Sequence, residues 1–328
     1  MAFSGTVSQT TFDTRKVIEH AIRQCKIPAQ QITAEHIDIA KGQLHLMLSA
    51  WASDNVPLWC IEKVILPIYD GNSAVVTPLG TVDVLNVNFR TISEVTNTDT
   101  TTSTEHEMYV SGGAAVTTIG VLWSSTAVPI ALERSDDDVV WTTVQTETPD
   151  ATGGEWTWFD LDSVQTASYY RVRATSGSLA LTQVYLGSNP AETPLGRINR
   201  DDWTSLPNKT FQSNRPAQFW FDRQARRPLI MVWPAPNSTA ELGQVIAYRQ
   251  RHIMDVGTLQ QEVEVPQRWY DAVVTGLAAR LVMELVEADV ALSPVLDARA
   301  EKAYYLAVNE ERDNSPIRIT PDLTAYTA

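Results

Sequence analysis

Residues 116–134 read VTTIGVLWSSTAVPIALER, two strand-like apolar runs separated by a polar turn. Runs of this length that are rich in β-branched and aromatic residues are typical of β-strands. Working outward, similar short runs cover residues 139–145, 156–161, 168–174 and 179–186. Short strands at this spacing favour an antiparallel β-sandwich in the middle of the chain.

The sequence on either side of this block has helical periodicity. Residues 13–53 carry apolar side chains at helical spacing, with a break at Pro28. A long helix is expected over 266–289, and another begins at Ser293. Because no helix here can cover its own apolar stripe, helices from the two ends of the chain must pack together. We therefore expect an α+β multidomain fold: an α-helical bundle core with β-hairpin elaborations, plus an inserted antiparallel, jelly-roll-like β-sandwich.

Composition suggests where the domains meet. Thr96–Thr104 contains six threonines in nine residues, which predicts a linker. From Thr96 to Asn189 there are 12 acidic and three basic residues, a net charge of −9, whereas the rest of the chain carries only −5. This asymmetry supports an inserted domain with its own surface. The expected limits are 1–95 and 191–313 for the two halves of the core, 96–190 for the insert and 314–328 for an extended tail.

Charge and cysteine content exclude several classes. The 328 residues carry 25 Lys and Arg against 39 Asp and Glu, a net charge of −14, which argues against general attraction to nucleic-acid phosphates. The two cysteines, Cys25 and Cys60, exclude a disulfide framework. Residues 1–11 show no secretory pattern, and no apolar run is long enough to predict a membrane span. We expect a soluble protein made in a reducing compartment.

Catalytic motifs are not found. There is no His-Glu-x-x-His pair, no phosphate-binding loop and no Gly-x-Ser-x-Gly elbow. The best cluster is Glu35-His36 with Asp38, which a charged helix face explains equally well. A cell-wall hydrolase that uses Glu35 and Asp38 remains a minor alternative. The sequence therefore predicts no enzymatic activity, no metal and no cofactor.

Two local features rise above this background. The insert is rich in aromatic residues, of which Trp141, Trp156 and Trp158 are candidates for stacking on sugar rings, although a small sandwich core is the simpler interpretation. The segment 197–228 holds seven basic residues against three acids. It reads either as a solvated hairpin, with paired strands at 217–222 and 228–234, or as a docking surface for an acidic partner or DNA phosphate.

Beyond these features, several stretches resemble the head-to-tail adaptor proteins of tailed bacteriophages, also called connector, head-completion or tail accessory proteins. The stretches are LWCIEKVILPIYDG (58–71), VVTPLGTVDVL (75–85), RDDW (200–203), LPNK (206–209), QFWFDR (218–223), WPAP (233–236), YRQRHIMDVG (248–257), VPQRWYDA (265–272), EERD (310–313) and SP (315–316). Together they cover about residues 12–95 and 195–320. Their order and spacing, more than any single motif, carry the resemblance.

What the resemblance implies is a structural virion protein that forms a ring, typically of 12 subunits, beneath the portal. Such a ring binds the portal protein, a tail or nozzle protein and neighbouring copies of itself, and double-stranded DNA passes through its lumen without specific binding or any membrane contact. It would be made in the host cytoplasm and located in the virion neck. Candidate partner-docking residues are Arg223, Arg226, Arg227, Arg249 and Arg251, together with Ser315, Pro316, Ile317 and Arg318 of the tail.

The insert resembles a different family. LERSDDD (132–138), VWTTV (140–144), WTWFDL (156–161) and YYRVR (169–173) are similar to galactose-binding-like, discoidin-type β-sandwiches. In that fold, loops at one end can bind sugar. The alternative to an adaptor is therefore a carbohydrate-binding or adhesin-like virion protein that acts through the sandwich.

Overall fold

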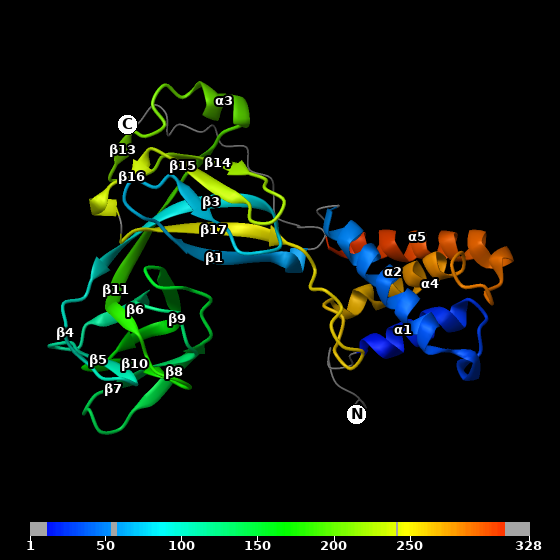
Figure 1. The fold of residues 1–328 in the computed structure, drawn as a ribbon, viewed down its shortest axis with the longest axis horizontal. Helices are drawn as coiled ribbons and strands as arrows, with labels where there is room; N and C mark the ends of the chain where they lie inside the picture. Colours follow the sequence, from blue (N-terminus) through cyan, green and yellow to red (C-terminus); the bar gives the residue numbers. More distant parts are fainter. Residues whose placement is uncertain (1–11, 54–57, 241, 312–328) are drawn as a thin grey trace, which may run out of the picture. The chain divides into compact units, whose positions relative to one another are not determined.

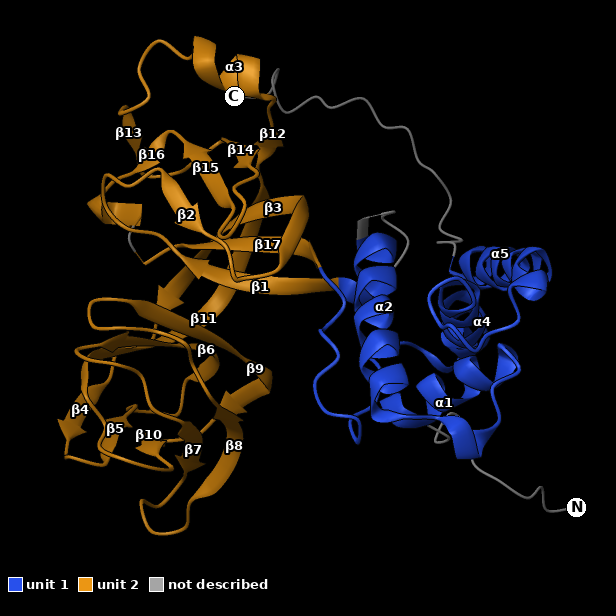
Figure 2. Ribbon diagram, turned by 45° about the vertical axis from the view of Figure 1, so that its right-hand side comes forward, with its two compact units in different colours: residues 1–60, 252–328 blue, residues 61–251 orange. Residues whose placement is uncertain are grey.

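The structure, a computed structural model, describes residues 12–53, 58–240 and 242–311. The chain forms two compact units, one from Met1–Cys60 with His252–Ala328 and the other from Ile61–Arg251 (Figure 2). We call them the helical unit and the β-unit.

The helical unit contains segments from both ends of the chain (Figure 1). Its α-helices are α1 (Thr14–Gln24), α2 (Ala34–Ser53), α4 (Tyr270–Leu281) and α5 (Ser293–Glu310), with short 3-10 turns η1 (Ala29–Gln31), η2 (Leu58–Cys60), η4 (Gln267–Trp269) and η5 (Val290–Leu292). Ile18 of α1, Leu44 of α2 and Leu277 of α4 belong to one buried cluster, as do Trp269 and Leu296. Helices from the two chain ends thus share a core, as their apolar stripes require.

The helix expected over 266–289 is shorter than the sequence pattern suggests. Helix α4 ends at Leu281, and η5 follows after a run of turns. Asp289 precedes η5, and its side chain accepts a hydrogen bond from the backbone N–H of Ala291 and so caps that turn. Periodicity continues through the turns because Val282 and Leu285 still face the core.

A six-stranded antiparallel sheet runs through the β-unit. Its strands are β1 (Ile61–Pro67), β3 (Thr81–Glu94), β6 (Ala115–Trp123), β9 (Trp156–Thr166), β11 (Leu181–Pro194) and β17 (Gln244–Arg251). Their order is β1-β17-β3-β11-β6-β9. The two 14-residue strands β3 and β11 carry the sheet from the region of β1 and β17 into the region expected to be the insert (Figure 1).

A five-stranded antiparallel sheet covers one end of the larger one. It has the order β4-β5-β10-β7-β8, with β4 (Thr98–Thr101), β5 (Glu105–Tyr109), β7 (Ile130–Ser135), β8 (Thr142–Glu147) and β10 (Tyr169–Ala174). Met108, Leu132 and Val172 from this sheet and Val121 and Leu186 from the larger sheet form one buried cluster. The two sheets therefore make the expected antiparallel β-sandwich.

The threonine-rich segment is not a free linker over its whole length. Thr98–Thr101 forms the exposed edge strand β4, which pairs with β5. Strand pairing uses backbone groups, so side chains that bury nothing do not prevent it.

The remaining strands form a small mixed sheet of order β12-β14-β15-β2 and a short β13–β16 pair. Their bounds are β2 (Ala74–Val76), β12 (Gly196–Arg197), β13 (Gln212–Ser213), β14 (Gln218–Asp222), β15 (Leu229–Trp233) and β16 (Ala235–Pro236). Helix α3 (Arg200–Ser205) and turn η3 (Ser238–Ala240) flank them. The expected hairpin of residues 217–234 is confirmed, since β14 pairs antiparallel with β15.

Candidate functional site

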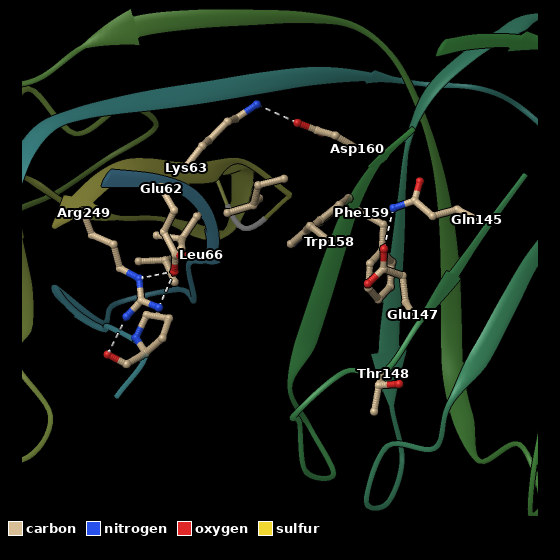
Figure 3. Close-up of a pocket in the computed structure, with 13 residues that line it drawn as sticks. Glu62, Lys63, Leu66, Gln145, Glu147, Thr148, Trp158, Phe159, Asp160 and Arg249 are labelled. Carbon is tan, nitrogen blue, oxygen red and sulfur yellow. Dashed lines mark hydrogen bonds and ion pairs between the residues drawn. The ribbon is translucent and has the colours of Figure 1, made fainter. Parts of the chain in front are cut away.

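The β-unit contains a cleft of about 730 Å³. One wall comes from β1 and Arg249 of β17, and the other comes from β8 and the first residues of β9 (Figure 3). β1 and β9 are the two edge strands of the six-stranded sheet, so the curled sheet brings its own ends to this cleft. A volume of this size falls in the range of roughly 300–1,000 Å³ that is usual for small-ligand sites.

Two pairs of charged side chains lie on the walls of the cleft. Lys63 on β1 donates to Asp160 on β9 at 2.7 Å, which joins the two edges. Glu62 accepts from the buried Arg249, which also donates to Thr81 Oγ1 at 2.8 Å. Glu147 also lines the cleft and accepts from the neutral amide of Gln145, so one carboxylate there has no ion-pair partner among the described residues.

Asp160 is the centre of a buried polar cluster. It accepts hydrogen bonds from Arg90 at 2.9 Å and from Thr118 at 3.2 Å, in addition to Lys63. Burial would raise the pKa of Asp160, but the hydrogen bonds from Arg90 and Lys63 outweigh burial and lower it. Asp160 is therefore held as a carboxylate between two cations.

Two residues that line the cleft each carry a buried atom without a hydrogen-bond partner: the indole nitrogen Nε1 of Trp158 and the amide oxygen Oε1 of Gln145. The Trp158 ring lies against Gly120, where a Cβ atom would come within 2.4 Å of it, so only glycine leaves room for this indole. The Gln145 amide nitrogen is engaged, because it donates to Glu147. Both unpartnered atoms are covered by protein and are not exposed to the cleft.

Trp156 and Trp158 do not offer faces for sugar stacking. Their rings stack on each other at 5.1 Å, and Trp158 also meets Tyr185 edge-on at 5.6 Å. Both side chains are buried in a small cluster with Tyr185. The prediction of stacking on these two rings is corrected, because their partners within the β-unit already cover them.

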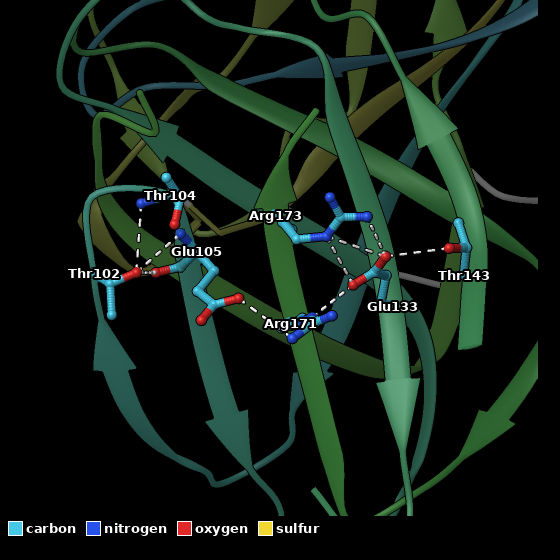
Figure 4. A network of polar contacts seen from close by, with 7 residues as sticks. All are labelled: Thr102, Thr104, Glu105, Glu133, Thr143, Arg171 and Arg173. Carbon is cyan, nitrogen blue, oxygen red and sulfur yellow. Dashed lines mark hydrogen bonds and ion pairs between the residues drawn. The ribbon is translucent and has the colours of Figure 1, made fainter. Parts of the chain in front are cut away.

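Trp141 differs from the other two tryptophans. It is only half-buried, and the guanidinium of Arg171 lies 4.1 Å from the centre of its ring. Arg171 belongs to a network on the outer face of the five-stranded sheet (Figure 4). In that network Glu133 accepts from Arg171 at 2.6 Å, from Arg173 at 2.7 Å and from Thr143 at 3.2 Å.

Glu133 is almost wholly enclosed, with 4% of the residue exposed. Burial would raise the pKa of Glu133, but hydrogen bonds from Arg173 and Arg171 lower it to about 2. Because every polar atom of this carboxylate has a partner, the network reads as structural support for the sheet.

Three of the expected docking arginines lie on the β14–β15 hairpin. Arg223, Arg226 and Arg227 are all exposed. Arg223 pairs with Asp83 at 2.9 Å, whereas Arg226 and Arg227 have no ion-pair partner among the described residues. Arg227 also borders a second cavity, of about 670 Å³, together with Val76 and Trp156.

Arg249 and Arg251 are not free for docking, so this prediction is corrected. Arg249 is 7% exposed and binds Glu62 and the carbonyls of Pro78 and Leu79. Arg251 donates to the other oxygen of Glu62 at 3.0 Å. Strand β17 lies between β1 and β3, so its side chains are taken up by neighbouring strands.

The remaining candidate residues belong to the helical unit or to the C-terminal tail. Glu35 and Asp38 are exposed on α2, while His36 is buried and bonds Glu287 at 3.1 Å. Cys25 donates to two backbone carbonyls, and burial raises the pKa of its thiol to about 11, as suits a packed cysteine. Ser315, Pro316, Ile317 and Arg318 lie outside the described residues.

Across residues 12–53, 58–240 and 242–311, no group of three or more His, Cys, Asp or Glu side chains is arranged to hold a metal. Within the same ranges, no helix has both the length and the apolar character needed to cross a bilayer.

Most residues that line the cleft could not be identified from the sequence. Glu62, Gln145, Asp160 and Arg249 are far apart in the chain and match no motif. The one available signal was strand alternation, which places Trp158 and Asp160 on the same face of β9.

Comparisons with known proteins do not show a family for this chain. No family model and no curated protein matches the sequence. Among solved structures, CBM32-1 from a family 31 glycoside hydrolase of Clostridium perfringens matches with 12% identity and a TM-score of 0.24, over 41% of this chain and 97% of that one.

Two further solved structures give similar values. The family 32 carbohydrate-binding module of Clostridium perfringens NanJ in complex with galactose has 10% identity and a TM-score of 0.23, over 40% of this chain and 97% of that one. A putative chitobiase fragment from Bacteroides thetaiotaomicron has 17% identity and a TM-score of 0.23, over 27% of this chain and 64% of that one. TM-scores this low do not establish a shared fold, so no function is carried over from these proteins.

Proposed function

We propose that this chain is a structural, non-enzymatic docking protein, the head-to-tail adaptor of a tailed bacteriophage. It would form a ring beneath the portal, with the twelve subunits that its sequence resemblance implies, and join portal to tail while DNA passes through.

The observation that carries the proposal is the exposed tip of the β14–β15 hairpin. Arg226 and Arg227 stand there without an ion-pair partner in the described chain, on a protein whose net charge is −14. Unpaired cations at the tip of a hairpin whose strands belong to a larger sheet are suited to binding an acidic protein partner. Some of the sequence stretches that resemble adaptors lie in the same region. QFWFDR covers β14, WPAP starts at the end of β15, and RDDW begins α3.

The overall charge also suits a DNA conduit. A ring through which a genome slides should not hold phosphate tightly, and acidic walls repel it. An acidic chain with a local basic hairpin can therefore bind a partner ring without gripping DNA.

Light scattering and negative-stain imaging of the full chain, alone and mixed with the portal protein of the same virion, test the proposal. We expect rings on the portal with an axial hole wide enough for duplex DNA. A chain that stays monomeric and ignores the portal would remove the proposal.

A charge reversal sharpens the test. Arg226→Glu with Arg227→Glu should weaken portal binding at least about tenfold, because each lost charge pair at an interface costs on the order of 1–2 kcal/mol. Arg299→Glu with Lys302→Glu, at two exposed cations of α5, is the matched control. Equal binding by both variants would exclude the hairpin as the docking element.

Carbohydrate binding by the sandwich is the second candidate. It is favoured by the half-exposed Trp141 and by Tyr109, whose ring lies 5.0 Å from that of Tyr169 on the same outer sheet face. Aromatic rings on a sheet face can stack on sugars. Glycan-array binding by the full chain that disappears in Trp141→Ala would support this candidate, and an empty array would remove it.

A further inference from the structure

We propose that the second cavity, of about 670 Å³, is a groove that takes an extended segment of the portal protein as an added β-strand beside β2. We call it the β2 groove. The inference rests on the proposed function and deepens it, because it states how the partner of the hairpin tip is bound and which chemistry its segment carries. Every residue that lines the groove belongs to the β-unit.

The β2 groove lies where the outer strands of two sheets meet. β2 is the last strand of the mixed sheet, and β1 and β9 are the two outer strands of the six-stranded sheet. Residues 74–76 of β2, 65–67 of β1 and 156–157 of β9 all line the groove. Outer strands carry backbone N–H and C=O groups that no neighbouring strand uses, so they are the places where another chain can add a strand.

The register of β2 shows which of its backbone groups are left over. The N–H of Thr77 donates to the carbonyl of Pro228 at 3.1 Å, and the carbonyl of Ser73 accepts from the N–H of Val232 at 2.8 Å. Because alternate residues of a strand turn their backbone groups to the same side, the N–H and C=O of Val76 turn away from β15. Val76 therefore offers a donor and an acceptor along the outer side of β2, which is the pattern that an added strand requires.

The side chains along the groove indicate apolar positions in the partner's segment. Val76 is 50% exposed and Leu79 is 62% exposed, although both are large apolar residues. Ile65 and Pro67 of β1 line the same groove and are half-buried. In an added strand every second side chain faces the same surface, so apolar residues at alternate positions would cover these side chains.

Charged side chains at the groove determine the polar residues of the segment. Arg227 is exposed and lies beside the end of β2, since the next residue, Pro228, bonds Thr77. Asp150 and Glu155 line the groove from the loop before β9, and neither has an ion-pair partner among the described residues. Complementary charge requires a carboxylate opposite Arg227 and a basic residue opposite the loop. The segment is thus extended, apolar at alternate positions and charged with both signs.

A proline at Val76 tests the added strand. Proline lacks the backbone N–H, and at Val76 that group makes no bond to β15, so the mixed sheet keeps its own hydrogen bonds. We expect Val76→Pro to weaken binding to the portal protein of the same virion about tenfold, because the added strand loses a backbone hydrogen bond. Surface plasmon resonance on immobilised portal measures the binding, and urea unfolding checks that the variant folds.

Asp99→Pro is the matched control, because it places proline at an exposed position of another outer strand, β4. Just after β4 the N–H of Thr102 donates to Glu105, so the same alternation turns the N–H of Asp99 away from β5. Asp99 does not line the groove, and Asp99→Pro should bind the portal as tightly as the unaltered chain.

Hydrogen exchange followed by mass spectrometry detects the added strand in the unaltered chain. The N–H of Val76 should exchange quickly in the isolated protein and become protected in the complex with the portal, whereas that of Asp99 should exchange equally fast in both. The inference is overturned if Val76→Pro binds the portal as tightly as the unaltered chain, or if residues 74–79 gain no protection. Protection by the tail protein alone would also overturn it.

The adaptor function and this inference fail in different ways. An unaltered chain that does not bind the portal removes both. Portal binding that survives Val76→Pro, or that leaves residues 74–79 unprotected, removes the added strand alone and leaves the adaptor function in place.

Discussion

Two carboxylates of the β-unit, Glu133 and Asp160, each hold two cationic side chains, yet their surroundings differ. Around Glu133, both arginines lie at the sheet surface, with Arg171 18% and Arg173 39% exposed. Around Asp160, Arg90 is only 2% exposed and its Nη2 atom has no partner. The first network is complete and stabilises a sheet face, whereas the second borders a cleft and leaves polar atoms unmet. The completeness of hydrogen bonding, more than the number of charges, therefore distinguishes the two networks.

The largest expected effect is that of Asp160→Ala. It leaves the Arg90 guanidinium buried with only Gln244 as a hydrogen-bond partner, and breaking a buried pair in this way costs about 3–5 kcal/mol. Glu133→Ala should cost about 3 kcal/mol, at the lower end of that range, because Arg171 and Arg173 can turn to water. Urea unfolding of both variants, followed by tryptophan fluorescence, measures the difference. A larger loss in Glu133→Ala would reverse the comparison.

Acid should act on both carboxylates in the same direction. The pKa of Glu133 lies at about 2 in the folded protein against an ordinary 4.5, so the unfolded chain takes up the proton first. This stability is fully present above pH 4.5 and is lost as the pH falls toward 2, with a total of up to about 3 kcal/mol. Glu133→Gln should flatten most of that decline in a pH series of unfolding free energies. The part that remains is expected from Asp160, whose pKa is also lowered.

The sequence allowed the strands of the sandwich and the β14–β15 hairpin to be predicted, because alternation and turn residues are local signals. It could not show that Trp156 and Trp158 are buried. The Trp-x-Trp spacing places both rings on one strand face, but whether that face meets solvent or Tyr185 depends on distant strands. The pairing of Lys63 with Asp160 likewise requires the two edges of a six-stranded sheet to meet, which no local pattern encodes.

Trp123 offers a matched partner for Trp158. Its indole N–H donates to Thr157 Oγ1 at 2.8 Å, whereas that of Trp158 has no partner. Substitution of either by Phe removes a similar volume from a buried site. Trp123→Phe should therefore lower the free energy of unfolding by about 1 kcal/mol more than Trp158→Phe in the absence of ligand. Equal losses would mean that the Trp158 N–H has a hydrogen-bond partner in solution.

The smallest expected effect on stability is at the hairpin. Arg226 and Arg227 are exposed and form no ion pair in the described chain, so Arg226→Glu with Arg227→Glu should change the free energy of unfolding by less than about 0.5 kcal/mol. Arg223→Ala removes the pair with Asp83 and should cost up to about 1 kcal/mol. Denaturant unfolding measures the loss of stability in both variants. The small losses expected here contrast with the larger ones expected when the pairs of Arg171 and Arg173 with Glu133 are broken. If the double reversal leaves the free energy of unfolding unchanged, a loss of portal binding in the same variant reports docking and not misfolding. A marked destabilisation would show instead that the hairpin tip contributes to the stability of the fold.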